Sequence, residues 1–225
     1  MTQNVCKGSR AVIADSLSLR HYHPMCNLYR LKNVERWEIA EATGADAAWQ
    51  HDMDVTKDYT APGGPGYVVR HEAGRRVLDA MRWGYPNPVA GKAPVTNIRN
   101  YSSPFWRASL KNPLQRCLVP VTSFQEWTLE PDPETGKKRP HWFSVPSRKI
   151  FNFAGAWRGT DKGPVFAFLT CGYDGDPSTH VVGAIHPKAC PVILHQEDEE
   201  RWLSAPIEDA LGLACTYPSQ LMAVE

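Results

Sequence analysis

The sequence has no hydrophobic run long enough to cross a membrane, because its longest uncharged apolar runs are only a handful of residues. Residues 1–24 contain no long apolar segment of the signal-peptide kind, only the short stretch 11–14. With 225 residues, the chain is large enough for one ordinary domain with its own core. We therefore expect a monomeric cytoplasmic protein with no membrane partner.

The chain also lacks the cysteine patterns of structural metal sites. Its six cysteines stand at positions 6, 26, 117, 171, 190 and 215, form no CxxC pair and have no His at zinc-finger spacing. Cysteines scattered in this way are typical of a reducing compartment. The sequence thus predicts no metal site and no cofactor.

Acidic residues are absent from one long segment, residues 80–125, although the net charge of the whole chain is only +1. This acid-free segment carries six basic residues and five interleaved aromatic residues: Arg82, Lys92, Arg99, Arg107, Lys111 and Arg116, with Trp83, Tyr85, Tyr101, Phe105 and Trp106. Positive charge with aromatic stacking platforms suits single-stranded nucleic acid. Equally, the aromatic residues can belong to the core and the basic residues to a solvated rim.

Hydrophobic patterning predicts a strand-rich α+β domain with short peripheral helices. Residues 59–66 are rich in Pro and Gly and predict a loop, and 67–83 predict a hairpin that turns near Gly74. Four more strand-like runs occupy 117–127, 141–145, 150–157 and 165–171, and a shorter one 191–194. Helices are expected from Asn33 to about Gly44, with Val34, Trp37 and Ala40 on one face, and at 104–111, 196–203 and 206–213.

Four short strings carry the residue types that chemistry needs: Met25-Cys26-Asn27-Leu28-Tyr29, Thr96-Asn97-Ile98-Arg99-Asn100, Ser123-Phe124-Gln125-Glu126-Trp127, and the segment from Ile185 to Leu194 with His186. In this order and spacing the chain resembles the SRAP family, the SOS response-associated peptidase-like proteins. Supporting strings include Ala61-Pro62-Gly63, Arg82-Trp83-Gly84 and Phe168-Leu169-Thr170. The resemblance runs from Met25 to about Trp202 and divides the chain into a leader, 1–24, and an SRAP-like domain, 25–225. For this domain it implies a barrel-like antiparallel sheet core.

The resemblance implies a protein that senses abasic sites in single-stranded DNA and captures them covalently, as part of DNA repair and the SOS response. In the family the initiator Met is removed, so that Cys26 would become the first residue. Its α-amine would form a Schiff base with the ring-opened sugar, and its thiol would close this to a thiazolidine. The protein would be associated with the nucleoid when bound to damaged DNA.

The chemistry of a terminal cysteine supports this implication. An α-amine has a pKa of about 7.7–8.0 and a thiol one of about 8.5, so both groups are partly nucleophilic near neutrality. A thiol on the same residue attacks the imine intramolecularly, which removes most of the entropic cost of a second encounter. Of the side chains, only that of cysteine places a thiol beside the α-amine.

The resemblance assigns roles to the other residues. Glu126 and His186 would perform acid–base chemistry, and Asn97 would hydrogen-bond Cys26 or the sugar. The DNA-binding residues would be Arg99, on a flanking phosphate, Trp83, beside the lesion, and Trp127, Thr170, Pro62 and Arg30. Taken singly, each residue has a plainer interpretation: a buried cysteine, a strand carboxylate, a loop histidine, a turn asparagine or a core tryptophan.

The chain departs from the family pattern at three places. Twenty-five residues precede Cys26, so either the true start is Met25 or the leader is removed, for instance by self-cleavage; until then the nitrogen of Cys26 is an amide that cannot form an imine. Leu28 stands where relatives commonly have Arg, and Arg30 is the nearest substitute. The segment from His186 to Pro191 replaces the usual His-Asp-Arg-Met-Pro.

Two other functions fit the same residues. Cys26 and His186 could form the nucleophile and base of a thiol peptidase or amidohydrolase, with Glu126 or Asn97 orienting the His. The acid-free segment could also serve a module that binds single strands without covalent chemistry, and such a module would bind intact and abasic strands alike.

Overall fold

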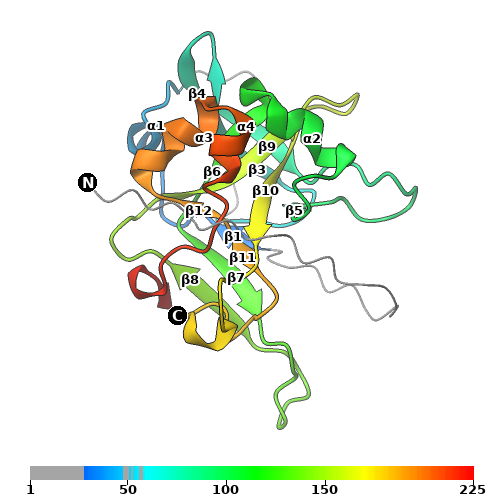
Figure 1. Cartoon of the computed structure of the whole chain (residues 1–225), viewed down its shortest axis with the longest axis vertical. Helices are drawn as coiled ribbons and strands as arrows, with labels where there is room; N and C mark the ends of the chain where they lie inside the picture. Colours follow the sequence, from blue (N-terminus) through cyan, green and yellow to red (C-terminus); the bar gives the residue numbers. More distant parts are fainter. Residues whose placement is uncertain (1–27, 48–50, 52, 56–57) are drawn as a thin grey trace.

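A computed structural model describes residues 28–47, 51, 53–55 and 58–225. It contains two sheets, with α-helices gathered around the larger one and the β7–β8 hairpin extending away from them (Figure 1). The strands are β1 Tyr29–Arg30, β2 Tyr59–Thr60, β3 Pro65–Glu72, β4 Arg75–Trp83, β5 Asn97–Ile98, β6 Arg116–Val121, β7 Ser123–Trp127, β8 Pro140–Ser144, β9 Phe151–Arg158, β10 Val165–Cys171, β11 Cys190–Pro191, β12 Ile193–Leu194 and β13 Ala223–Val224. The α-helices are α1 Arg36–Thr43, α2 Pro104–Lys111, α3 Glu199–Ser204 and α4 Ile207–Leu211, and the short 3-10 helices are η1 Pro113–Gln115, η2 Pro177–Thr179, η3 Gln196–Asp198 and η4 Ser219–Leu221.

The smaller sheet has five strands in the order β13-β8-β7-β1-β2. Strand β7 lies at its centre and pairs antiparallel with β1, where Tyr29 lies opposite Phe124, and with β8, where Glu126 lies opposite His141. The larger sheet has eight strands. Seven follow the order β11-β10-β4-β3-β6-β9-β12, which returns on itself because β9 also pairs with β10, and the eighth, β5, pairs with β10 off this path. The prediction of a strand-rich α+β domain is therefore confirmed. The sheet is not purely antiparallel, however, because β10 pairs in parallel with β4 and β5.

The predicted hairpin is present as β3 and β4, which pair from Pro65 opposite Arg82 to Glu72 opposite Arg75. Ala73 and Gly74 form its turn, and both have positive φ angles, 47° and 77°. This geometry is typical of the tight turns whose twist matches that of the flanking strands. The predicted loop at 59–66 is shorter than expected, because β2 occupies its first two residues and β3 begins at Pro65.

The first helix begins later than predicted. Asn33 has a positive φ of 54° and does not cap it; Glu35 is the N-cap, and its backbone N–H donates to the carboxylate of Glu38 at 2.7 Å. The helix buries Ile39, Ala40 and Thr43, whereas Trp37, which we placed on one face with Ala40, is 63% exposed. The second helix has the predicted bounds, because the Ser103 side chain accepts from the backbone N–H of Phe105 and Pro104 takes the first helical position.

An aromatic cluster joins the two sheets. Tyr29 and Phe124 come from the smaller sheet and Trp83, Phe153 and Phe168 from the larger, and all five side chains are fully buried. Tyr29 meets Trp83 edge-on at 5.2 Å, and Phe124 meets Phe153 edge-on at 5.6 Å between ring centroids. Each such pair contributes about 0.5–1.5 kcal/mol beyond its buried area. The cluster therefore fixes the start of β1 against β7.

A glycine makes room for this arrangement. A Cβ added at Gly66 would lie 2.2 Å from the hydroxyl oxygen of Tyr29 and 3.1 Å from the Phe166 ring. Only glycine lets β3 pass so close to Tyr29.

For the acid-free segment, the structure confirms the plainer interpretation of its largest aromatic residues. Trp83, Tyr85 and Trp106 are buried in the core, and Tyr101 and Phe105 are partly buried against it. Five of the six basic residues are exposed, and Arg116 is the exception. Cys117, Cys171 and Cys190 are buried free thiols. In the part of the chain that the structure describes, no helix is long and apolar enough to span a membrane.

Candidate functional site

Glu126 lies near the end of β7, on the face of the sheet that points into the molecule. Side chains alternate along a strand, so Glu126 shares this face with Phe124, two residues earlier, whose ring packs in the aromatic cluster. Only 1% of Glu126 is exposed. A buried carboxylate among aromatic rings needs polar or charged neighbours.

His186 supplies one of these neighbours from a turn nearly sixty residues later in the chain. Its ring nitrogen Nδ1 lies 3.7 Å from the Glu126 carboxylate and 3.2 Å from the backbone carbonyl oxygen of Trp127. Because a carbonyl oxygen only accepts, the bond to Trp127 requires the proton to be on Nδ1. In the neutral ring Nε2 is then the bare, basic nitrogen. It is buried and has no hydrogen-bond partner among the described residues.

The surroundings keep the imidazole neutral. Burial is the main cause that lowers the pKa of His186 below its usual 6.5, while the Trp127 carbonyl acts in the opposite direction. Three nearby cations lower the pKa further, namely Lys188, Lys138 and Arg99. At neutral pH the ring can therefore accept a proton through Nε2.

Leu28, the first described residue, bonds to β7 close to Glu126 and His186. The backbone N–H of Gln125 donates to the carbonyl of Leu28 at 2.9 Å, so Gln125 faces the β1 edge of β7. Alternate residues of a strand face the same edge, and Trp127 therefore directs its carbonyl to this edge as well. Because Trp127 bonds to His186 there, the imidazole lies on the β1 side of β7, about 7 Å further along the strand than the Leu28 contact.

Strands β5 and β10 carry two further predicted residues. Asn97 is half-buried, lies opposite Phe168 in the parallel pair, and donates through Nδ2 to the Thr96 hydroxyl at 3.3 Å. Thr170 follows Phe168 by two residues, is 1% exposed, and has a buried hydroxyl with no hydrogen-bond partner in the described part of the chain. The hydroxyl of Tyr101 donates to the Thr170 carbonyl at 2.8 Å.

Arg99 links β5 to the turn that carries His186. It is exposed, and its guanidinium donates to the backbone carbonyl of Lys188, two residues after His186. A cation is thus held at the rim of the site.

The structure does not bring every predicted DNA-binding residue to this site. Trp83 is fully buried, stacks on Phe168 at 5.1 Å and donates from its indole N–H to the Thr96 carbonyl, so it cannot present a ring face to a base in this structure. Its large ring fills the core in this structure, and the role beside a lesion stays a prediction. Arg30 leaves the opposite face of the sheet from Glu126, and its guanidinium lies 3.3 Å from the centroid of the Trp142 ring. Trp127 is half-buried and Pro62 is exposed.

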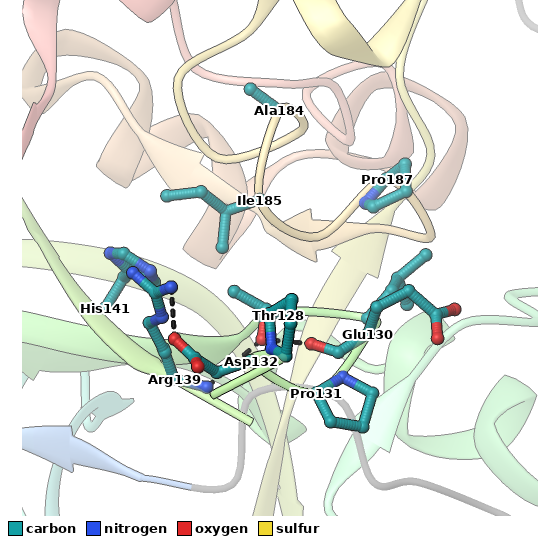
Figure 2. Close-up of a pocket in the computed structure, with 11 residues that line it drawn as sticks. Thr128, Glu130, Pro131, Asp132, Arg139, His141, Ala184, Ile185 and Pro187 are labelled. Atoms are coloured by element: carbon teal, nitrogen blue, oxygen red, sulfur yellow. Dashed lines mark hydrogen bonds and ion pairs between the residues drawn. The ribbon is translucent and has the colours of Figure 1, made fainter. Parts of the chain in front are cut away.

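A pocket of about 420 Å³ lies between the β7–β8 hairpin and the turn that contains Ile185 and Pro187, the two neighbours of His186 in the sequence (Figure 2). His141 lines it from β8 and Thr128 from the start of the β7–β8 connector, and Ile185 and Pro187 line it from the turn above. His141 lies opposite Glu126 in register, so the two side chains leave the same face. The remaining wall is the β7–β8 connector, which Asp132 shapes by accepting the backbone N–H groups of Glu134 and Thr135 and by pairing with Arg139.

Our sequence reasoning missed Tyr173, whose hydroxyl donates to the backbone carbonyl of His186 at 3.1 Å. It lies in a polar, glycine-containing stretch two residues after β10, and no local pattern distinguishes it from a loop residue. Cys26, the predicted nucleophile, lies outside the described residues. Within those residues, no group of three or more His, Cys, Asp or Glu side chains could hold a metal ion.

The comparisons with known proteins agree with this architecture. The family model described as "SOS response associated peptidase (SRAP)" matches residues 25–225. Two Bacillus subtilis relatives are named abasic site processing proteins, YoqW, 29% identical over 146 residues, and YobE, 27% identical over 143. Each alignment covers 61% of this chain; the chain spans 62% of the length of YoqW and 63% of that of YobE.

Two solved structures share the fold. A protein from Bordetella bronchiseptica is 24% identical with a TM-score of 0.65, and the match covers 88% of this chain and 98% of that one. A protein from Bacteroides thetaiotaomicron is 20% identical with a TM-score of 0.69, covering 88% and 90% of the two chains.

Proposed function

The chain belongs to the SOS response associated peptidase (SRAP) family, and from this premise we propose that it captures abasic sites in single-stranded DNA through Cys26. The relatives named abasic site processing proteins support the DNA-repair part of this proposal. The observation that carries it is the buried pair of Glu126 and His186 at the β1 edge of β7, next to the point where the described chain begins.

Chain connectivity supports Cys26 as the nucleophile. Cys26 precedes Leu28, the first residue that the structure describes, by two positions in the sequence. The Leu28 carbonyl bonds to Gln125, and His186 occupies the same edge about 7 Å further on.

The proposed reaction has two steps. The free α-amine of Cys26 adds to the aldehyde of the ring-opened sugar and loses one water to give an imine. The thiol then adds to the imine carbon, and its proton passes to the nitrogen, which yields a thiazolidine. Both steps move protons on and off the sugar oxygen and the nitrogen, and positioned acid–base groups accelerate such transfers by about 10²–10⁴-fold.

Glu126 and His186 are suited to these transfers. The neutral His186 ring offers Nε2 as a proton acceptor, and Glu126 lies within reach of the same imidazole. Burial of both groups excludes water that would hydrolyse the imine. Asn97 and the Thr170 hydroxyl would hydrogen-bond the sugar or Cys26.

The single-stranded DNA would bind where exposed basic side chains border the site. Arg99, at the rim, would contact a phosphate, and the other exposed cations of the acid-free segment would add to the field. Trp127, Pro62 and Arg30 remain proposed contacts for the strand, whereas the buried position of Trp83 gives it a structural role in the core.

The leader must be absent before capture, because in the chain of 1–225 the nitrogen of Cys26 is an amide. We propose that the active form starts at Cys26, through initiation at Met25 or through removal of the leader by self-cleavage. A thiol peptidase acting on other substrates is the second candidate, and the buried Glu126–His186 pair is the observation that favours it.

The test compares a chain that starts at Met25, and loses that Met, with the 1–225 chain. Each is incubated with single-stranded DNA that carries one abasic site, and adducts are separated by denaturing electrophoresis. We expect a heat-stable adduct from the first chain, none from its Cys26→Ala variant, and one from 1–225 only after the leader is lost.

Two controls separate the alternatives. Cys26→Ser keeps the amine but lacks the thiol, so its adduct should survive only after borohydride reduction. Intact DNA should give no adduct. If both chains bind abasic and intact strands alike and form no adduct, the covalent proposal fails and the non-covalent module remains.

A further inference from the structure

Tyr173 makes a contact that the proposed reaction does not yet use. Its hydroxyl donates to the backbone carbonyl of His186 at 3.1 Å. Burial raises the pKa of Tyr173 well above its usual value, so the hydroxyl stays protonated and remains a donor. We infer that Tyr173 is a positioning residue that holds the imidazole of His186 in the capture site, an inference that rests on the proposed function.

The contact closes a long excursion of the chain. After Tyr173 the chain turns through η2 and returns only at His186. The excursion folds tightly on itself, because a Cβ at Gly183 would lie 2.2 Å from the carbonyl oxygen of Pro177. The backbone N–H of His186 donates to the Val182 carbonyl at 2.8 Å, a bond internal to the excursion. The Tyr173 hydroxyl instead ties His186 to the chain just beyond β10.

Tyr173 is itself held in place. Its ring packs on that of His180, with centroids 5.1 Å apart. His180 accepts the N–H of Val182 at Nδ1 and therefore carries its proton on Nε2, which donates to the carbonyl of Tyr217 at 2.9 Å. Tyr173 therefore connects the backbone of His186 to the end of β10 and, through His180, to the C-terminal segment.

Three hydrogen bonds then fix the position of the His186 imidazole. The His186 backbone N–H bonds to Val182, its carbonyl to Tyr173, and its ring nitrogen Nδ1 to Trp127. If the Tyr173 contact is lost, the backbone can rotate about the other two. The Nδ1 bond would weaken, the ring would gain access to water, and Nε2 would no longer be held as the basic nitrogen.

Charged groups from several elements act on the ring, and the substitution leaves each of them unchanged: Glu126 on β7, Lys138 on the β7–β8 connector, Arg99 after β5 and Lys188 after the turn. The Cys190 thiol on β11 differs, because it interacts with the Tyr173 hydroxyl itself. Burial is the first cause that lowers the pKa of His186. Looser packing should therefore move this pKa upward, toward its usual value.

The experiment compares the chain starting at Cys26 with its Tyr173→Phe variant, in which the ring and its contact with His180 are kept. The titration and tautomer of His186 are read by NMR, and the rate of adduct formation with abasic single-stranded DNA is measured from pH 5.5 to 8.5. In Tyr173→Phe we expect the His186 pKa to rise by about half a unit, with a mixture of tautomers. Adduct formation should slow about 3- to 10-fold.

Tyr85→Phe is the matched control, because Tyr85 is a buried tyrosine whose hydroxyl bonds to Ser109 in the core. It should cost similar stability and leave the titration of His186 unchanged. The inference is overturned if Tyr173→Phe titrates like the parent chain, or if Tyr85→Phe shifts His186 equally. If the parent forms no adduct, the proposed function fails, and the NMR titration still decides whether Tyr173 positions His186.

Discussion

Replacing Glu126 by Gln tests whether the carboxyl group of Glu126 transfers a proton in the proposed reaction. The substitution keeps the size and shape of the side chain but removes its ability to give and take a proton. Glu126 is 1% exposed, and the His186 Nδ1 lies 3.7 Å from its carboxylate, so the substitution removes the carboxyl group that lies beside the imidazole. We expect imine formation to slow by about 10²–10⁴-fold, the usual contribution of a positioned acid–base group.

The assay is a time course of adduct formation by the chain starting at Cys26, with abasic single-stranded DNA in excess. Glu130→Gln is the matched control, because Glu130 is an exposed carboxylate on the wall of the pocket in Figure 2. It should react at the parental rate. Urea unfolding of both variants shows whether the fold is kept. A Glu126→Gln variant that folds and reacts within threefold of the parent would refute the acid–base role.

Four further outcomes follow from the packing and charges. Trp83→Phe should destabilise the fold by about 1–3 kcal/mol in urea unfolding, with adduct yield falling only in proportion to the folded fraction; a selective loss of DNA binding would contradict its place in the core. Gly183→Ala should slow capture, because the added Cβ would meet the Pro177 carbonyl at 2.2 Å and displace the turn that carries His186; an unchanged rate would show that this turn is loosely held. Glu199→Leu should cost about 3 kcal/mol in the free energy of unfolding, because it removes the carboxylate that two arginines share in a nearly buried position; a neutral effect would count against that network. His186→Gln should reduce the loss in free energy of unfolding that occurs as the pH becomes acidic. The native pKa of His186 is lowered and that of the unfolded chain is about 6.5, so stability present at neutral pH is lost as pH falls below about 6.5; urea unfolding at pH 7.5 and 5.5 measures the difference.

Local patterns in the sequence predicted most of the regular structure. Alternating or continuous apolar runs located β6 to β10, and Ser103 with Pro104 defined the start of α2 within one residue. The start of α1 was misplaced because Asn33 is a good cap by type, yet the local backbone places it in a left-handed conformation and leaves the cap to Glu35. Strands of two residues, such as β5 and β13, have too few positions to show a pattern.

The candidate site was predicted from a family resemblance, and the sequence alone could not supply its geometry. Glu126 and His186 meet because a long excursion returns to the β1 edge of β7, and nothing local in the sequence specifies that return. The same limit explains Trp83. Its basic surroundings suggested a stacking platform, but whether a tryptophan lies inside or outside depends on the pairing of β4 with β3 and β10. Tyr173 was missed because its contact with His186 is made by a single hydroxyl that reaches another part of the chain.

The most direct measurement of the central claim is the position of the covalent bond. The chain starting at Cys26 is reacted with abasic single-stranded DNA and digested with protease and nuclease, and the linked peptide is sequenced by mass spectrometry. Capture through a thiazolidine predicts one linked peptide that begins with Cys26, with a mass equal to peptide plus sugar fragment less one water and no free thiol on that residue. A bond to an internal lysine, or the same adduct from Cys26→Ala, would contradict it.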